Sequence, residues 1–176
     1  MCPEGALRGS DALRGIRRRP DGVVDALPSC KGVYAICFRL DSPVIVMGRG
    51  GKVLGSAGPG LVLYVGSAGG PGGLRSRISR HFWGADRCWW HVDCISRAAA
   101  SVEFIFYRVG SSGVKAEDEL AGRLMELESL RPVGMLGATD SKRPHMFICS
   151  DRAAVVSLLK SVGTLVDFGD DHVGGT

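Results

Sequence analysis

A chain of 176 residues with a hydrophobic fraction of 45% is sized for one ordinary core, so two domains are not expected. It shows no N-terminal apolar stretch typical of a signal peptide and no apolar run of about 18 residues. We therefore expect a cytoplasmic protein without a membrane partner. Six cysteines without a CxxC pair are expected to remain free thiols.

The formal net charge of +4 is unevenly distributed along the chain. Residues 8–19 hold five arginines against one acid, and residues 75–87 hold four arginines and a histidine against one acid. Residues 117–128 hold five acids against one arginine. Basic clusters of this size suit a polyanion such as nucleic acid. A solvated basic face remains the alternative, above all for residues 8–19.

The N-terminal half predicts a basic, loosely ordered arm over residues 1–28, followed by strands. The predicted strands, rich in branched and aromatic residues, are 32–40, 44–48 and 61–66. The second is expected to be the hairpin partner of the first, because an Asp-Ser-Pro turn separates them. A glycine-rich loop over residues 48–60, with a short strand at 52–54, leads to the third.

The C-terminal half predicts three helices and three strands. The expected helices are residues 74–82, 116–130 and 152–162, the last capped by Asp151. The expected strands are residues 88–95, 102–109 and 145–149. A globular domain over residues 29–165 and a flexible tail over 166–176 complete the chain. This order predicts an α+β fold, a small central mostly antiparallel sheet flanked by helices.

Four side chains with functional groups suited to catalysis lie near the predicted strand ends and in the first predicted helix. Tyr34 and Tyr64 face one cleft if their strands are neighbours, although a lone strand tyrosine is more often half-buried with a solvated hydroxyl. Arg77 and His81 lie four residues apart, so they share one helix face. A surface arginine beside a packed histidine is an equally good interpretation of that pair.

Glu117 lies in line with the apolar face of the predicted helix 116–130, at its N-terminal end. A carboxylate there is costly unless a group pairs with it. One interpretation is a favourable interaction with the helix dipole. The other is a ligand for a hard cation such as Mg²⁺, which takes one or two carboxylates and keeps waters for a phosphate.

Cys88, His91 and Cys94 have the residue types of a zinc site, but their spacing argues against one. On a strand, the two cysteines would point one way and the histidine the other. No fourth ligand is evident.

The remaining candidates form a set suited to phosphodiester cleavage. Hydrolysis needs a base for water, a cation to neutralise the phosphate and a group that stabilises the leaving oxygen. A tyrosine with a lowered pKa, a guanidinium and a carboxylate-bound metal would supply these functions.

Several segments carry a family resemblance. They are KGVY (31–34), LYVGSA (63–68), GLRSRISRH (73–81), WHVD (90–93), EDELA (117–121) and TDSKRPHMF (139–147). In this order they resemble the GIY-YIG nuclease superfamily, and more closely a mainly archaeal branch of it that has been labelled a domain of unknown function. The match spans about residues 31–149.

The resemblance implies an α/β sandwich and hydrolysis of nucleic acid with Mg²⁺ or Mn²⁺. It implies that Tyr34 is the general base, that Tyr64 orients water or phosphate, and that Arg77 stabilises the phosphate. His81 would lie by the scissile group, and Glu117 would bind the metal.

Further site residues follow from the same resemblance and from charge. His91 and Asp93 would share a strand face, so that His91 helps to line the site. The late segment lacks the two cysteines of the branch, and Lys142 and Arg143 stand there as phosphate contacts. Arg75 and Arg80 are further nucleic-acid-binding candidates.

The sequence thus favours a metal-dependent endonuclease acting on double-stranded DNA in repair, at abasic or structured sites. A non-catalytic nucleic-acid-binding module and an RNA endonuclease remain alternatives. The three tryptophans are interpreted as core residues rather than base-stacking groups; they are Trp83, Trp89 and Trp90.

Overall fold

The computed structural model describes residues 22–48, 51–84, 88, 90–134, 141 and 143–168. Most of the predicted basic arm and the last residues of the predicted tail lie outside these ranges. The strands are β1 (Gly32–Leu40), β2 (Val44–Met47), β3 (Val53–Ala57), β4 (Gly60–Ala68), β5 (Ser101–Val109), β6 (Leu130–Pro132), β7 (Met146–Cys149) and β8 (Thr164–Asp167). The helices are α1 (Gly73–Trp83), α2 (His91–Ala98), α3 (Val114–Leu124) and α4 (Arg152–Val162).

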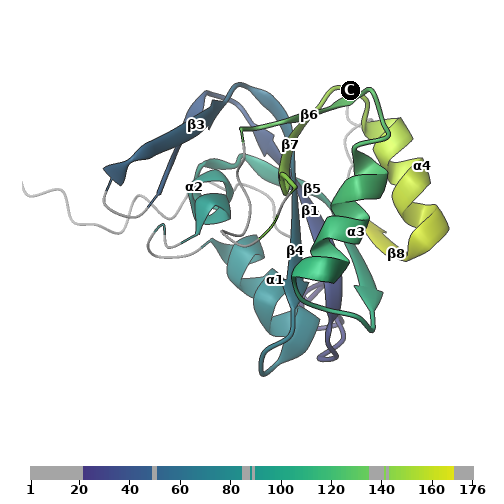
Figure 1. Ribbon diagram of the computed structural model, residues 1–176. Coiled ribbons are helices and arrows are strands. Elements are labelled where there is room, and N and C mark those ends of the chain that lie inside the picture. The colour runs from purple at the N-terminus through teal and green to yellow at the C-terminus, as the bar shows by residue number, and fades with distance from the viewer. Residues whose placement is uncertain are drawn as a thin grey trace, which may run out of the picture.

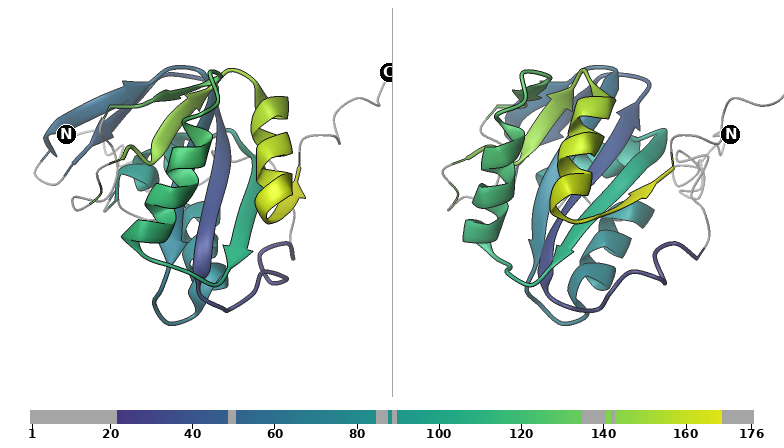
Figure 2. Two further views of the ribbon diagram at one scale, coloured as in Figure 1. Left: turned by 45° about the vertical axis from the view of Figure 1, so that its right-hand side comes forward. Right: turned by 90° about the vertical axis from the view of Figure 1, so that its right-hand side faces the viewer.

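The main sheet has six strands in the order β6-β7-β4-β1-β5-β8, and all neighbouring strands are antiparallel. Helices pack on both of its faces (Figures 1 and 2). The predicted α+β fold with a central antiparallel sheet is therefore confirmed. Among the described residues, no helix has the length and apolar character needed to cross a membrane.

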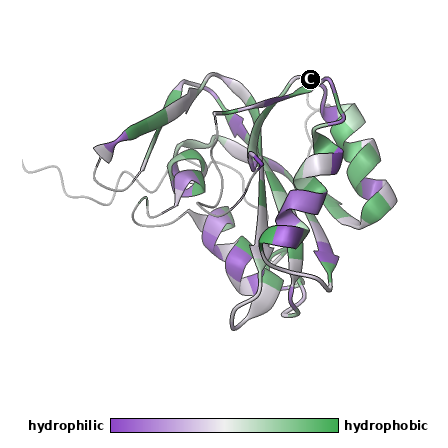
Figure 3. Ribbon diagram, viewed as in Figure 1, coloured by the Kyte–Doolittle hydropathy of each residue, from purple (hydrophilic) through white to green (hydrophobic). Residues whose placement is uncertain are grey.

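The central strand β1 explains the two-sided core. Its side chains alternate, so Tyr34 and Phe38 point toward α1 and α2, whereas Val33 and Cys37 point toward α3 and α4. Almost every residue of β1 is buried, as expected for a strand covered on both faces. Figure 3 shows the complementary pattern, with hydrophilic residues along the outward faces of α1 and α3.

The first glycine of the GVY segment is required by close packing. A Cβ atom at Gly32 would overlap the carbonyl oxygen of Arg108 and lie 2.8 Å from Leu74 Cδ1. The residue therefore lets β1 start against both β5 and helix α1.

The predicted hairpin between the first two strands is wrong. Strand β2 pairs with β3 in a separate two-stranded sheet, in which Val44 lies opposite Ala57. The physical reason is that both edges of β1 are occupied, one by β4 and the other by β5. The β2–β3 ribbon therefore extends away from the main sheet and packs on α2 (Figure 1).

The predicted strand 88–95 is also wrong, because residues 91–98 form helix α2. Val92, Ile95 and Ala99 are buried at spacings of three and four, which is the period of a helix. Asp93 accepts a hydrogen bond from the Trp90 N–H at 2.8 Å and so caps the first turn. Strong β-propensity in Trp, Val and Ile conceals this signal in the sequence.

The other predicted elements agree with the structure apart from their ends. Helix α3 stops at Leu124, earlier than expected, and the short strands β6 and β8 are not predicted. Asp151 caps α4 as predicted, accepting a hydrogen bond from the Ala154 N–H at 3.1 Å. The cysteines of the described residues are free thiols, as expected.

Candidate functional site

Three aromatic rings from three different elements meet on the face of the sheet that carries α1. They belong to Tyr34 of β1, Tyr64 of β4 and His81 of α1. The ring centroids are 6.3 Å apart for the two tyrosines, 6.1 Å for Tyr34 and His81, and 5.7 Å for Tyr64 and His81. The structure therefore brings together three of the site residues predicted from the sequence.

The glycine of the YVG segment makes room for this cluster. Gly66 lies directly opposite Tyr34 in the β1–β4 ladder. A Cβ atom at Gly66 would lie 2.5 Å from the Tyr34 hydroxyl oxygen and 3.0 Å from Tyr64 Cε1. The Tyr34 side chain thus fills the space that a larger residue at position 66 would occupy.

Arg77 lies one helical turn before His81, and its guanidinium stacks on an indole. Its Cζ atom is 5.2 Å from the ring centroid of Trp90. Arg77 Nε is buried and makes no hydrogen bond to the described residues. The Tyr34 hydroxyl shares this property, although Arg77 is close enough to influence its pKa.

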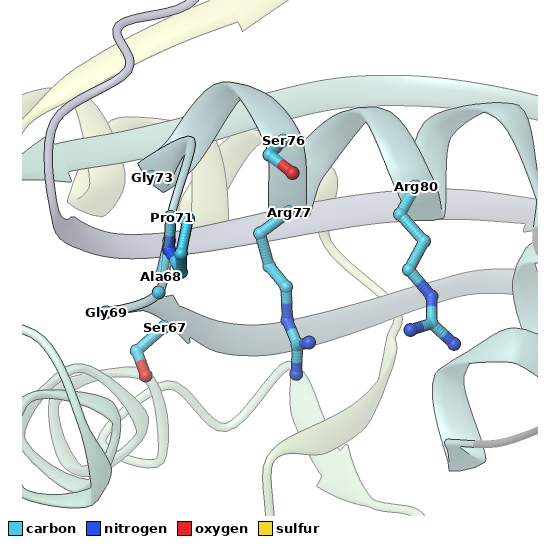
Figure 4. Close-up of a pocket in the computed structure, with 9 residues that line it drawn as sticks. Ser67, Ala68, Gly69, Pro71, Gly73, Ser76, Arg77 and Arg80 are labelled. Atoms are coloured by element: carbon cyan, nitrogen blue, oxygen red, sulfur yellow. The ribbon is translucent and has the colours of Figure 1, made fainter.

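An open pocket of about 470 Å³ lies between the end of β4, the following glycine-rich loop and α1. Arg77 and Arg80 extend in the same direction from α1, and Arg77 lies between Arg80 and Ser67 (Figure 4). The N–H groups of Leu74 and Arg75 at the start of α1 donate to backbone carbonyls. The positive charge of the pocket therefore comes from the two arginine side chains rather than from the helix N-terminus.

Asp93 holds this side of the site together. It is fully buried, and its Oδ2 atom accepts hydrogen bonds from Arg80 at 3.0 Å and from the Trp90 N–H at 2.8 Å. Its Oδ1 atom lies 3.5 Å from His81 Nδ1. The aspartate of the WHVD segment thus connects α2 to the histidine and one arginine of α1.

The expectation that His91 and Asp93 share a face is wrong. Two residues apart on a helix rather than a strand, they point in different directions. Within the described residues, His91 makes no ring contact or hydrogen bond with Tyr34, Tyr64 or His81. Partial burial lowers the pKa of His91.

Glu117 lies in the first turn of α3, with a side chain only 13% exposed. Its Oε2 atom is 3.3 Å from Nδ1 of His145, and the Nε2 atom of that histidine is 3.1 Å from Oδ1 of Asp118. Ser141 donates a hydrogen bond to the same Asp118 oxygen at 2.5 Å. His145 was not among the site residues predicted from the sequence. The sequence signal for it is its position in the late TDSKRPHMF segment.

The charge of Glu117 acts on the aromatic cluster although α3 packs on the opposite face of the sheet. Pairing between β4 and β7 ends where Tyr64 meets Met146, and the Val65 N–H then donates to the His145 carbonyl at 2.8 Å. His145, which contacts Glu117, therefore follows directly on the strand pairing that holds Tyr64. The Glu117 charge accordingly raises the pKa of both Tyr34 and Tyr64.

The expected tyrosine with a lowered pKa is not found in the protein alone. Burial raises the pKa of Tyr34 well above its usual range, and the Tyr64 hydroxyl raises it further, while Arg77 opposes the shift. Burial and the Glu117 charge raise the pKa of Tyr64 to about 12. Without additional positive charge, both phenols are protonated at neutral pH.

The residues of the site fit a hard divalent cation. Glu117 provides one mostly buried carboxylate, whose charge influences both phenols. Mg²⁺ and Mn²⁺ bind oxygen ligands, and Mg²⁺ commonly takes one or two carboxylates and keeps several waters. The described residues contain no cluster of three or more histidine, cysteine or acidic groups that could hold a metal ion. The strand on which the spacing argument against zinc at Cys88, His91 and Cys94 rested is a helix from His91 onward.

The nucleic-acid-binding candidates have different surroundings. Arg80 lines the pocket, whereas Arg75 donates a hydrogen bond to the Leu27 carbonyl at 2.8 Å. Arg143 lies on the exposed surface near Gly122 of α3. Lys142 lies outside the described residues.

The interpretation of the tryptophans as core residues is wrong for two of them. Trp83 and Trp90 are 46% and 47% exposed. Trp89 lies outside the described residues.

The fold and the site together define an α+β domain with a phenol, imidazole and guanidinium cluster beside a buried carboxylate. Residues 33–167 match the family described as "Domain of unknown function DUF123", and the chain belongs to this family. No curated protein and no solved structure matches the chain significantly.

Proposed function

We propose that this protein is a divalent-metal-dependent endonuclease that hydrolyses phosphodiester bonds of DNA, at abasic or structured sites in repair. The resemblance of its GVY and YVGSA segments to the GIY-YIG nucleases supports the reaction class. The choice of lesion or structure as substrate draws on that resemblance alone.

The observation that carries the proposal is the convergence of Tyr34, Tyr64, His81 and Arg77 within one cluster, where the charge of Glu117 on α3 raises the pKa of both tyrosines. These residues come from four separate elements, and a stable fold alone does not require a buried carboxylate beside two phenols. A site for a phosphate, an attacking water and a cation accounts for all of them.

Each residue has a role that its surroundings permit. Arg77 binds the phosphate and stabilises the charge that develops on it, because its guanidinium lines an open pocket. Tyr64 orients the attacking water. Tyr34 acts as the base once positive charge has lowered its pKa, and Arg77 already acts in that direction.

His81 is the second group in the cluster that can accept a proton. Burial lowers the pKa of His81, so its imidazole is neutral at pH 7. Its ring lies beside both phenols. It is therefore the group beside the phenols that can accept a proton from a tyrosine hydroxyl, and in this conformation both of its ring nitrogens are buried.

Glu117 is the residue that would hold Mg²⁺ or Mn²⁺. When bound, the cation neutralises phosphate charge and favours the ionised form of nearby hydroxyl groups. His145, whose other ring nitrogen contacts Asp118, keeps the Glu117 carboxylate in place before the cation arrives.

A non-catalytic DNA-binding module is the second candidate, and one observation favours it. The Tyr34 side chain is 0% exposed, so water does not reach it directly in this conformation. The presence of Glu117 favours the enzyme instead, because a carboxylate next to a phosphate site repels the ligand unless a cation intervenes.

A nicking assay with purified protein tests the proposal. Duplex DNA with and without a single abasic site is incubated with Mg²⁺, Mn²⁺ or a chelator. We expect strand cleavage that depends on the metal and is lost in Glu117→Gln. Glu119→Gln on the same helix is the matched control, because Glu119 is exposed and pairs with Arg108 instead.

The outcomes separate the two candidates. Cleavage by the native chain and by Glu119→Gln, but not by Glu117→Gln, supports the endonuclease. DNA binding without cleavage under all metal conditions would support the non-catalytic module. Full activity of Glu117→Gln would remove the metal-binding role of that residue.

A further inference from the structure

We propose that Trp90 is a stacking platform for an unpaired base of DNA, adjacent to the phosphate-binding Arg77. This inference rests on the proposed function, because it assigns the substrate class of the same site. It predicts that the substrate is DNA containing at least one unstacked nucleotide rather than an intact duplex.

The exposure of Trp90 is the first observation. Its side chain is 47% exposed, although tryptophan is highly buried on average in folded proteins. A large aromatic group exposed to this extent at the edge of a cationic pocket is typical of a nucleic-acid contact.

The position of Trp90 is the second observation. The Arg77 guanidinium lies 5.2 Å from the indole centroid. Arg77 and Arg80 also line the neighbouring pocket. Because the guanidinium covers one face of the indole, a base would stack on the other face, with its own phosphate within reach of these positive charges, which matches the alternation of base and phosphate along a single strand.

The rigidity of Trp90 is the third observation. Its N–H donates to Asp93 Oδ2 at 2.8 Å, and its carbonyl accepts from the Asp93 N–H at 2.9 Å. The same carboxylate oxygen holds Arg80 at 3.0 Å. The buried Asp93 thus fixes the backbone of the platform and one phosphate-binding side chain relative to each other, which reduces the ordering cost of binding.

The chemistry of stacking defines the ligand. Every base has a π face, so an indole platform binds bases without sequence preference. In an intact duplex these faces are covered by neighbouring base pairs. An abasic site, a flap or a single strand offers an exposed face at little unstacking cost.

Tryptophan fluorescence tests the platform without requiring cleavage. In the variant Trp83→Phe/Trp89→Phe, Trp90 is the only tryptophan. This protein is titrated, in the presence of chelator, with a single-stranded DNA, a duplex carrying a tetrahydrofuran abasic analogue, the intact duplex and a single-stranded RNA of the same sequence. We expect saturable quenching by the first two DNAs and much weaker quenching by the intact duplex.

Affinity measurements complete the test. We expect Trp90→Ala to weaken binding of the single-stranded and abasic DNAs by about 10-fold or more, but that of the intact duplex by less than about 2-fold, while Trp90→Phe keeps most of the affinity. Trp83→Ala is the matched control, because Trp83 is equally exposed, and it should leave all affinities unchanged.

Each outcome supports or contradicts the Trp90 platform, the DNA substrate or the endonuclease. Unchanged Trp90 fluorescence, or an equal loss of affinity for all DNAs in Trp90→Ala, overturns the platform. Stronger binding of the single-stranded RNA than of the single-stranded DNA overturns the assignment to DNA. Selective quenching without cleavage when Mg²⁺ is added supports the platform while contradicting the endonuclease. Absence of binding to every probe overturns both.

Discussion

The Nδ1 atom of His145 lies 3.3 Å from Oε2 of Glu117, and this contact links the late TDSKRPHMF segment to the first turn of α3. The other ring nitrogen of His145 lies 3.1 Å from Asp118. One almost fully buried imidazole thus orients two consecutive carboxylates. Of these, Glu117 is the one whose charge acts on the two tyrosines.

His145→Ala is expected to impair metal use more than DNA binding. Loss of a group that orients a metal ligand typically costs about 10- to 100-fold in metal affinity or activity. We therefore expect the Mg²⁺ concentration for half-maximal cleavage to rise by about 10-fold or more, while the affinity for DNA in chelator changes little. A loss of activity that is equal at every Mg²⁺ concentration would show that His145 acts only through folding.

Gly66→Ala is expected to disturb the site more than the fold. The added Cβ would lie 2.5 Å from the Tyr34 hydroxyl and would displace that phenol. Overpacking costs about 1–3 kcal/mol of stability, and a shift of about 1 Å in a reacting group can cost about 100-fold in rate. Cleavage rates and urea denaturation together measure the two effects.

Gly58→Ala is the matched control for this substitution. A Cβ at Gly58 meets no atom within 4 Å, and Gly58 does not line the pocket. This variant should retain both activity and stability. Equal losses in the two variants would contradict a specific role for Gly66 as the space for Tyr34.

The sequence predicts the α+β fold with a central, mostly antiparallel sheet because the elements near β1 follow simple periodicity. Residues 32–40 are apolar or aromatic apart from Arg39, which is typical of a strand buried on both faces, and 74–82 carry a single apolar stripe. Tyr34, Tyr64 and His81 converge as predicted because they lie on these well-predicted elements.

The errors arise where local preference and tertiary context disagree. The segment CWWHVDCI has strong β-propensity, yet the burial of Val92, Ile95 and Ala99 and the cap by Asp93 make residues 91–98 a helix. The role of His145 depends on a contact with Glu117, 28 residues away, which no local pattern encodes. The raised pKa values of the tyrosines depend on burial, which only the assembled sheet produces.

Asp93→Asn is expected to destabilise the protein in a pH-dependent way. Burial opposes ionisation of Asp93, but the nearby His81 imidazole, the hydrogen bond from the Trp90 amide and the charge of Arg80 outweigh it, so the pKa of Asp93 is lowered. We expect a loss of about 1–3 kcal/mol at pH 7, measured by urea denaturation.

The pH dependence of this loss follows from the sign of the shift. Because the folded-state pKa of Asp93 lies below the unfolded value of about 3.9, its contribution is complete above that pH. It disappears as the pH falls through the folded-state pKa, so native protein and Asp93→Asn should converge in stability under strongly acidic conditions. A constant difference across this range would contradict the ionic role of Asp93.

His81 is expected to titrate below the ordinary histidine pKa of about 6.5. Burial is the largest cause of the lowered pKa, the charges of Arg77 and Arg80 act in the same direction, and Asp93 opposes them. NMR titration of the imidazole Cε1 proton measures this value, with the resonance assigned by its absence in His81→Gln. Asp93→Asn should lower the pKa of His81 further, because it removes the opposing charge.

The lowered pKa of His81 also determines how stability and cleavage are expected to depend on pH. The unfolded chain binds this proton more readily than the folded protein, so acidification below about pH 6.5 favours unfolding, and His81→Gln should weaken that dependence. If His81 accepts a proton during cleavage, the acid limb of kcat/KM lies below about pH 6.5 and moves to lower pH in Asp93→Asn. A titration of His81 at or above its ordinary pKa would contradict both predictions, because the imidazole would then be charged in the site at neutral pH.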